Sequence, residues 1–144
     1  MVEQREHTAG SAVLKIVPNA SWKTLGPTVR GHIEGANTTV VTDGHGGYSP
    51  LQSAGVEHEA TKLGTPEAAG DVLPWAHTIL SNLKAWLLGT FRGVSHKHLD
   101  RYLQEFTYRL NRRWNENKLF YYLTRRAVEA KPLPYHRLIA EPIG

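Results

Sequence analysis

The segment from Thr38 to Tyr48 constrains the fold more than any other stretch of the chain. It reads TTVVTDGHGGY, a short β-branched run that ends on Asp43 and is followed by three glycines within four positions. β-Branched residues suit a buried parallel strand, and the glycines allow the chain to turn immediately after it. The segment therefore predicts a strand of an α/β sheet with Asp43 at its carboxyl end.

Two interpretations of Asp43 remain open at this point. Ligands of open α/β sheets gather beyond the carboxyl ends of strands, and a carboxylate there suits a hard cation or a phosphate held through one. Asp-Gly is also a common turn pair, so the same residue could do no more than shape a tight turn. The segment alone favours the turn.

The length and composition indicate one soluble globular domain. The chain has 144 residues and 40% hydrophobic residues, enough for a core. It has no cysteine, which excludes disulfides and thiolate metal sites. No apolar run approaches the roughly 18 residues needed to cross a bilayer, and the polar amino terminus shows no secretory signal. We therefore expect a cytoplasmic protein without a membrane partner.

The net charge of +4 hides an asymmetry along the chain. Residues 1–83 carry five Lys and Arg against eight Asp and Glu, whereas residues 84–131 carry eleven against four. A basic half indicates a polyanionic partner, nucleic acid first and an anionic membrane second. Solvated helix faces also collect basic residues, so an ordinary exposed helix surface explains the same charge.

The first 63 residues predict a small sheet with one helix. We expect a turn at residues 8–11, strands at residues 12–17, 40–42 and 56–63, and a short helix or loop at residues 49–55. Ser21 is a candidate N-cap for a helix that runs toward Ile33, although Pro27 conflicts with its pattern and could be its true start. Residues 34–37 should close that helix. Strand, helix and strand in this order imply a parallel crossover.

The remaining residues predict helices. A loop at residues 64–72 leads to a first long helix at residues 73–88, which Gly89 should end. A second helix follows Ser95, a third is capped by Asn117, and the tail at residues 132–144 should be irregular. The expected buried positions are Trp75, Ile79, Leu83, Trp86 and Leu87 on the first helix, Leu99, Tyr102, Leu103, Phe106, Leu110 and Trp114 on the second, and Leu119, Tyr122, Leu123 and Ala127 on the third. Residues 73–131 thus form a basic helical portion behind the sheet portion at residues 1–63.

The first long helix carries a group of polar residues with possible chemistry. At 100° per residue, His77, Ser81 and Lys84 share one face, and Asn82 lies at the edge of the apolar stripe. Asparagine disfavours a helix interior unless its amide has a function, such as offering its oxygen to a metal ion or bonding the sheet. Lys84 could hold a phosphate. An ordinary amphipathic helix explains the same spacing.

The segments VTDGHGGY and HTILSNLKAWLLGTFRGVSHKHLDRYLQEFTYRLNRR resemble bacterial insertion-sequence transposases of the ribonuclease-H-like DDE superfamily. The closest group has an Asp-Asp-(Asn/Glu/His)-Lys signature, and the resemblance runs from about Ala12 to Ile139. It implies an α/β, partial ribonuclease-H-like fold, a mixed sheet flanked by helices with a helical carboxyl-terminal portion. It also implies DNA transposition, the cutting and joining of DNA strands at insertion-sequence ends with Mg²⁺ or Mn²⁺.

The resemblance also assigns roles to residues. Asp43 matches the second catalytic aspartate, Asn82 the third metal-site position and Lys84 the trailing lysine. Asp43 and Asn82 are thus the implied metal ligands, and all three are the implied catalytic residues. The implied DNA-binding residues are His77, Ser81, Lys84, Arg109, Arg112 and Arg113. The implied partners are the element ends, the target DNA and, for the complete protein, further copies of itself.

One departure from the family pattern concerns the first catalytic aspartate. In the family it lies on a sheet strand that precedes anything present here, and the nearest acids, Glu3 and Glu6, sit in no comparable motif. Two metal ions need several anionic oxygen ligands. We therefore expect an amino-terminally truncated transposase domain that is inactive by itself. The alternative is a catalytically inactive remnant that only binds DNA or a partner subunit. A missing strand would also leave an exposed sheet edge that promotes pairing with another chain.

Overall fold

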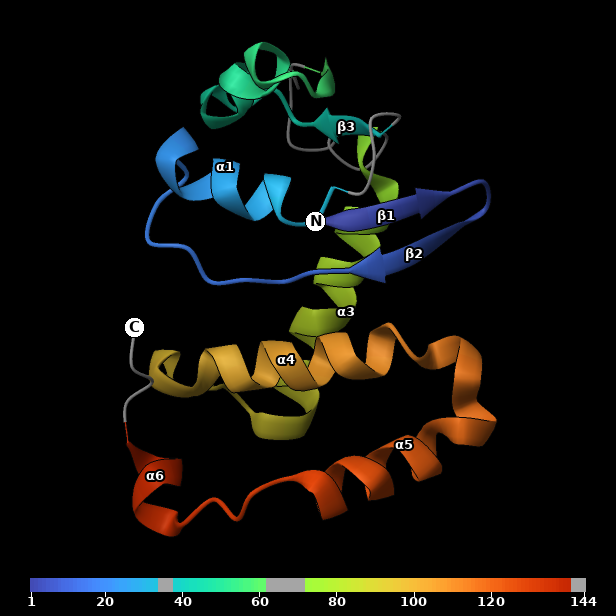
Figure 1. The fold of residues 1–144 in the computed structure, drawn as a ribbon, viewed down its shortest axis with the longest axis vertical. Helices are drawn as coiled ribbons and strands as arrows, with labels where there is room; N and C mark the ends of the chain where they lie inside the picture. Colours follow the sequence, from blue (N-terminus) through green and yellow to red (C-terminus); the bar gives the residue numbers. More distant parts are fainter. Residues whose placement is uncertain (34–37, 62–71, 141–144) are drawn as a thin grey trace.

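Two short β ribbons form one half of the molecule, and helices form the other (Figure 1). β1 (Val2–Arg5) and β2 (Thr8–Ala12) pair antiparallel, whereas β3 (Thr39–Thr42) and β4 (Glu57–Ala60) pair parallel. The computed structural model describes residues 1–33, 38–61 and 72–140. The helix ending expected at residues 34–37, and all but the last residue of the loop expected at residues 64–72, lie outside the described residues.

The amino-terminal hairpin corrects the sequence prediction. β2 occupies the residues expected to turn, and the expected strand at residues 12–17 has no regular structure beyond Ala12. Pairing with β1 determines where the strand lies, because Val2 is opposite Ala12 and Arg5 is opposite Thr8. The Glu3 carboxylate adds a cross-strand bond by accepting from the Ser11 amide at 2.8 Å. Strand pairing therefore outweighs the local turn preference of this segment.

The parallel ribbon confirms the central prediction. β3 ends at Thr42, immediately before Asp43, and its partner β4 aligns Val40 with His58. The connection between the two strands contains a 3₁₀ helix, η1 (Gly46–Ala54), where a short helix or loop was expected. β4 covers only part of the strand predicted at residues 56–63, and residues 62 and 63 lie outside the described residues.

Helix α1 (Trp22–Arg30) follows the hairpin and contains Pro27 in its interior. The helix begins at Trp22 and not at the proline. Asn19 organises this start, because its Oδ1 accepts from the Ser21 amide at 3.1 Å and from the Thr24 hydroxyl at 2.9 Å. Pro27 lacks an N–H, so the helix continues with one backbone bond fewer. Ser21 occupies the N-cap, as predicted, without a capping bond from its side chain.

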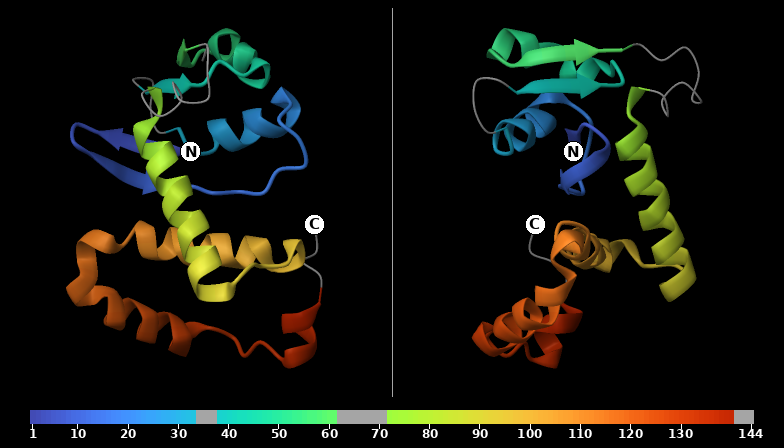
Figure 2. Two further views of the ribbon diagram at one scale, coloured as in Figure 1. Left: turned by 180° about the vertical axis from the view of Figure 1, so that it is seen from behind. Right: turned by 90° about the vertical axis from the view of Figure 1, so that its right-hand side faces the viewer.

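Helix α3 (Pro74–Phe91) runs from the ribbons to the helical half, as the two views of Figure 2 show. It continues past Gly89, so the prediction that this glycine ends it is wrong. The helix ends where Arg92 (φ 52°) and Gly93 (φ 116°) adopt positive φ, a conformation that glycine favours at helix ends. Ile79 and Leu83 are its buried residues, as the periodicity predicted.

The core lies where the hairpin meets α3 and α4 (Leu99–Leu110). Buried Ala9, Ala12 and Ile79 form its centre. Partly buried side chains surround them: Val2, Trp75, Phe106 and Leu110. A second, aromatic cluster joins the far end of α3 to α4, with ring contacts among Trp86, Phe91, Tyr102 and Phe106. Trp75 and Trp86 therefore serve packing, as expected.

The last helices pack less than predicted. The 3₁₀ turns η2 (His96–His98) and η3 (Arg113–Asn115) flank α4, and α5 (Glu116–Glu129) follows with Asn115, not Asn117, at its cap. Trp114 is 61% exposed, and α5 has no buried residue, so Leu123 and Ala127 do not point into a core. The tail is not wholly irregular, because α6 (Tyr135–Ile139) is helical and its Leu138 carbonyl accepts from Arg101 at 2.6 Å.

None of the helices in the described ranges is long and apolar enough to cross a membrane.

Candidate active site at the end of strand β3

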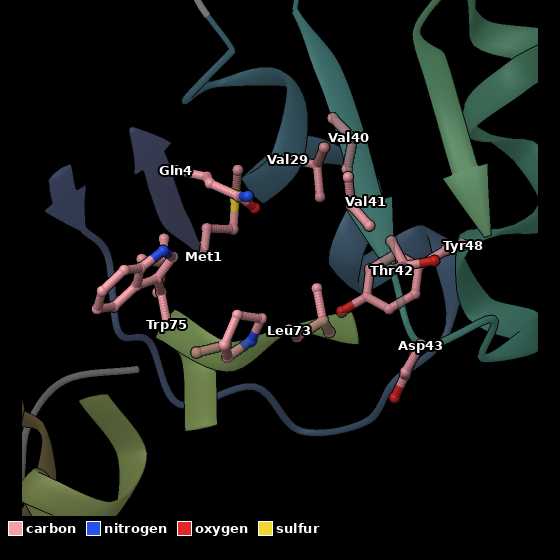
Figure 3. Close-up of a pocket in the computed structure, with 13 residues that line it drawn as sticks. Met1, Gln4, Val29, Val40, Val41, Thr42, Asp43, Tyr48, Leu73 and Trp75 are labelled. Carbon is pink, nitrogen blue, oxygen red and sulfur yellow. The ribbon is translucent and has the colours of Figure 1, made fainter. Parts of the chain in front are cut away.

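A cavity of about 230 Å³ lies between the two ribbons (Figure 3). Both ribbons and both neighbouring helices contribute to its wall. The lining residues are Met1, Val2 and Gln4 from the hairpin, Val40, Val41, Thr42 and Asp43 from β3 and its end, Tyr48 from η1, Val29 from α1, and Leu73, Pro74, Trp75 and Ala76 from the beginning of α3. Asp43 is the carboxylate in this wall.

Asp43 sits in a turn that its own side chain helps to form. One carboxylate oxygen accepts from the His45 amide at 3.1 Å, and the His45 ring accepts from the Gly47 amide at the same distance. Gly44 follows with φ 75°, a conformation that side chains rarely adopt. The Asp43 side chain remains exposed. Asp43 therefore does shape a tight turn, and its exposed carboxylate also leaves oxygen accessible for a ligand.

A hydrogen-bonded pair of buried Thr42 and half-buried His58 supports this turn. Thr42 is only 6% exposed, and its Oγ1 lies 2.9 Å from Nε2 of His58 on β4. The same hydroxyl oxygen accepts from the Gly44 amide at 3.3 Å. His58 thus reaches the Asp43 turn through Thr42. Sequence analysis missed His58, because only the parallel register that sets His58 opposite Val40 reveals this neighbour.

Tyr48 is the other polar residue that sequence analysis did not single out. Burial raises the pKa of its phenol, and the negative charge of Asp43 raises it further. The phenol therefore keeps its proton at neutral pH and can donate a hydrogen bond. Figure 3 shows Tyr48 and Asp43 at the same end of the cavity. Its position at the end of the VTDGHGGY segment was the available signal.

The expected partners of Asp43 lie farther along α3. His77, Ser81, Asn82 and Lys84 are all exposed. The cavity is lined by the first turn of α3, and Asn82 follows Pro74 by eight residues, about 12 Å along a helix axis. The structure therefore brings Asp43 to the beginning of α3, whereas Asn82 does not line the cavity. A cation shared by Asp43 and Asn82 stays a prediction.

The donor set fits a metal ion only in part. No group of three or more His, Cys, Asp or Glu side chains that could hold a metal occurs in the ranges 1–33, 38–61 and 72–140. Asp43 offers one accessible carboxylate, and Asn82 offers a neutral oxygen. Hard divalent cations need more anionic ligands than this, and a two-metal site needs many more. The described residues alone do not form a two-metal centre.

The three arginines predicted to bind DNA differ in their surroundings. Arg109 is exposed and pairs with Glu105 at 2.7 Å on the same helix. The Arg112 guanidinium lies over the Tyr108 ring, 3.7 Å from its centroid. Arg113 donates to the carbonyls of Leu110, Ala9 and Gly10, and therefore joins η3 to β2. Arg109 and Arg112 remain surface cations, whereas the Arg113 guanidinium is engaged within the fold.

Asn111 lies in the LNRR end of the segment that carries the family resemblance, and the structure gives its side chain a structural role. Its side-chain Oδ1 accepts from the Ala12 amide at 2.8 Å, and its Nδ2 donates to the Ala12 carbonyl at 2.9 Å. The amide thus bonds β2 as a neighbouring strand would. Its partner lies 99 residues away in the chain, so no local pattern could indicate this contact.

The described residues thus form a small α/β domain with an accessible carboxylate at the end of β3 and helices on its carboxyl-terminal side. The family model of the ISXO2-like transposase domain matches residues 1–111. The chain belongs to this family, which confirms the resemblance to insertion-sequence transposases of the DDE type and the partial ribonuclease-H-like α/β fold. Neither the curated proteins nor the solved structures contain a match. Helices α5 and α6 lie beyond the matched residues.

Proposed function

We propose that this domain serves metal-dependent cutting and joining of DNA strands at insertion-sequence ends, as part of a complete transposase. The observation that carries the proposal is the accessible carboxylate of Asp43 at the end of β3, in a chain that belongs to a transposase family. Mg²⁺ or Mn²⁺, when bound, would polarise the phosphate and activate the attacking oxygen. The supply of further acidic ligands is part of the proposal, because Asp43 and Asn82 alone are too few.

The proposal gives each candidate site residue a role. Asp43 and Asn82 would provide oxygen ligands, and Lys84 would contact a DNA phosphate from the exposed face that it shares with His77 and Ser81. Arg109 and Arg112 would bind the DNA backbone without reading its sequence. Association of the complete protein with further copies of itself also belongs to the proposal.

A second candidate function is DNA binding without catalysis. The single accessible carboxylate at the cavity and the lack of a metal-binding cluster among the described residues favour it. Under this alternative the basic helices would still hold DNA or a full-length partner. The two candidate functions differ in whether Asp43 has a catalytic role in addition to its structural role in the turn.

Strand transfer of a labelled element end in Mg²⁺ or Mn²⁺ distinguishes them. If the proposal is correct, Asp43→Asn should reduce transfer by a factor of 100 or more, because the substitution removes one of the few anionic ligands of the site. Glu59→Gln is the matched control, an exposed acid on β4, and should leave transfer unchanged. Because the proposal requires further acidic ligands, the assay uses the complete transposase, and DNA binding without any transfer by that protein would favour the inactive remnant.

The salt dependence of DNA binding tests the basic surface. Arg112→Gln should lower the slope of log affinity against log salt by about 0.9, the value for one released counterion. Arg113→Gln should change the slope less, because its guanidinium is engaged by carbonyls of β2 and of Leu110 at the end of α4. Thermal melts of both variants control for folding. An unchanged slope for Arg112→Gln would remove that residue from the DNA interface.

A further inference from the structure

The exposed apolar side chains of the protein gather near its carboxyl end. Twelve large apolar side chains are exposed among the described residues, and nine of them lie between Trp114 and Ile139. Figures 1 and 2 show α5 at one end of the molecule, with α4 between it and the ribbons. A cluster of exposed apolar side chains marks an interaction surface. This one lies beyond the residues that match the family model, so the family domain does not account for it.

Helix α5 carries an exposed stripe along one side, which we call the α5 stripe. At 100° per residue one side of the helix holds Phe120, Leu123, Thr124, Ala127 and Val128. All five are exposed, and the side chains of Phe120 and Val128 are each 81% exposed. The opposite side holds half-buried Leu119 and Tyr122. The α5 stripe therefore points away from the rest of the described chain, and it contains no charged residue.

The α5 stripe is complementary to itself when two copies lie antiparallel. Its bulkiest side chain, Phe120, lies near the beginning of the stripe, and the small Ala127 and Val128 lie at its end. A two-fold axis beside Thr124 would set Phe120 of each copy against Ala127 and Val128 of the other. Large side chains opposite small ones fill an interface well. A parallel pair would set Phe120 against Phe120 and leave the small residues facing each other.

The charges at the two ends of α5 favour the same direction. Glu116 begins the helix, and Lys131 follows its last residue, Glu129, by two positions. Neither Glu116 nor Lys131 forms an ion pair within the described residues. Antiparallel helices would bring Glu116 of each copy near Lys131 of the other, whereas parallel helices would bring two Glu116 carboxylates together. We propose that the α5 stripe binds the α5 stripe of a second copy of this chain, with the two helices antiparallel.

The exposed area fits a weak pair. Two α5 stripes would bury on the order of 1,000 Å², near the lower bound for a specific interface. Association is therefore expected at micromolar concentrations. Because α5 lies at the other end of the molecule from the ribbons, pairing would leave Asp43 accessible. The proposal gives a surface to the self-association that belongs to the proposed function, and it rests on that part of the function alone.

Sedimentation of the full chain without DNA or metal ion tests the pairing. A monomer–dimer equilibrium in the micromolar range is expected. Phe120→Glu places a charge in the stripe of both copies and should weaken dimerisation by about tenfold or more. Leu88→Glu, at a side chain of α3 that is 67% exposed, is the matched control and should not. Circular dichroism checks that both variants fold. A chain that stays monomeric, or a dimer that survives Phe120→Glu, would overturn the proposal.

Cross-linking tests the direction of the helices. The chain has no cysteine, so a single introduced thiol has no competitor. Thr124→Cys lies beside the axis and should give a disulfide-linked dimer on oxidation. Asn117→Cys should not, because antiparallel helices would hold the two thiols about 20 Å apart, too far for a disulfide. Ready linking through Asn117→Cys, or none through Thr124→Cys, would overturn the antiparallel arrangement.

Both assays omit DNA and metal ion, so the pairing and the proposed catalysis can fail separately. Dimerisation through the α5 stripe, without strand transfer by the complete transposase, would support the pairing and contradict only catalysis. Strand transfer by the complete transposase, with a chain that stays monomeric, would contradict only the pairing.

Discussion

The two ribbons have the same number of strands, but the rest of the molecule holds them differently. The antiparallel hairpin packs Ala9 and Ala12 against Ile79 and is bonded by Asn111 and Arg113. The parallel ribbon relies on contacts within itself, chiefly Thr42 with His58 and Thr39 with Glu57. The hairpin is therefore the scaffold that joins sheet to helices, whereas the parallel ribbon presents Asp43 with local support only.

The largest expected effect comes from the core beneath the hairpin. Ile79→Ala should lower the free energy of unfolding by about 2–5 kcal/mol, because it leaves a cavity between α3 and β2. Leu80→Ala is the matched control on the same helix, where the side chain is 46% exposed, and should cost far less. Urea unfolding followed by circular dichroism measures both. Similar losses for the two variants would mean that the hairpin is not packed as described.

The cross-links between β2 and α4 provide an intermediate effect. Asn111→Ala should cost about 1–3 kcal/mol of unfolding free energy, because two partly buried backbone groups of Ala12 lose their partners. Thr42→Val makes the corresponding change in the parallel ribbon, where only local bonds are lost, and should cost about 1 kcal/mol. Equal losses of unfolding free energy in urea would mean that the hairpin is not held more strongly by the rest of the molecule than the parallel ribbon is.

The sequence was sufficient where structure depends on neighbouring residues. The β-branched run before Asp43 predicted β3, and the helical period predicted that Ile79 and Leu83 are buried. Prediction from the sequence failed where contacts between residues far apart in the chain determine the secondary structure. Local composition predicted a turn at residues 8–11, whereas pairing with β1 places these residues in strand β2.

Packing partners cannot be read from a helix's own pattern. The apolar stripe of α5 predicted a buried face, yet the helix has no buried residue, and Leu123 of that stripe is 50% exposed. For the site, sequence identified Asp43 but not His58 or Tyr48, whose proximity depends on strand register and on the path of η1. The relation of Asn82 to Asp43 depends on where α3 meets the sheet, which helical spacing does not define.

The smallest expected effect concerns pH and the hairpin alone. A bond from the Arg5 side chain, then one from the Ser11 amide, lowers the pKa of Glu3 from 4.5 to about 2. A lowered folded-state pKa means that this contribution to stability is present above pH 4.5 and is lost as the pH falls toward 2. The Glu3 side chain is 46% exposed, so solvent should limit the contribution to less than about 1 kcal/mol.

Glu3→Gln should therefore flatten the fall of the melting temperature between pH 4.5 and 2, because glutamine cannot lose the charge that Arg5 and Ser11 recognise. Glu59→Gln places the same change on the parallel ribbon, at an exposed residue without an ion pair among the described residues, and should leave the fall as it is. A flattened fall in both variants would show that acid acts through the total charge of the protein. A flattened fall in Glu3→Gln alone would place the effect in the hairpin, where protonation of Glu3 weakens the bonds that it accepts from Arg5 on the same strand and from Ser11 on β2.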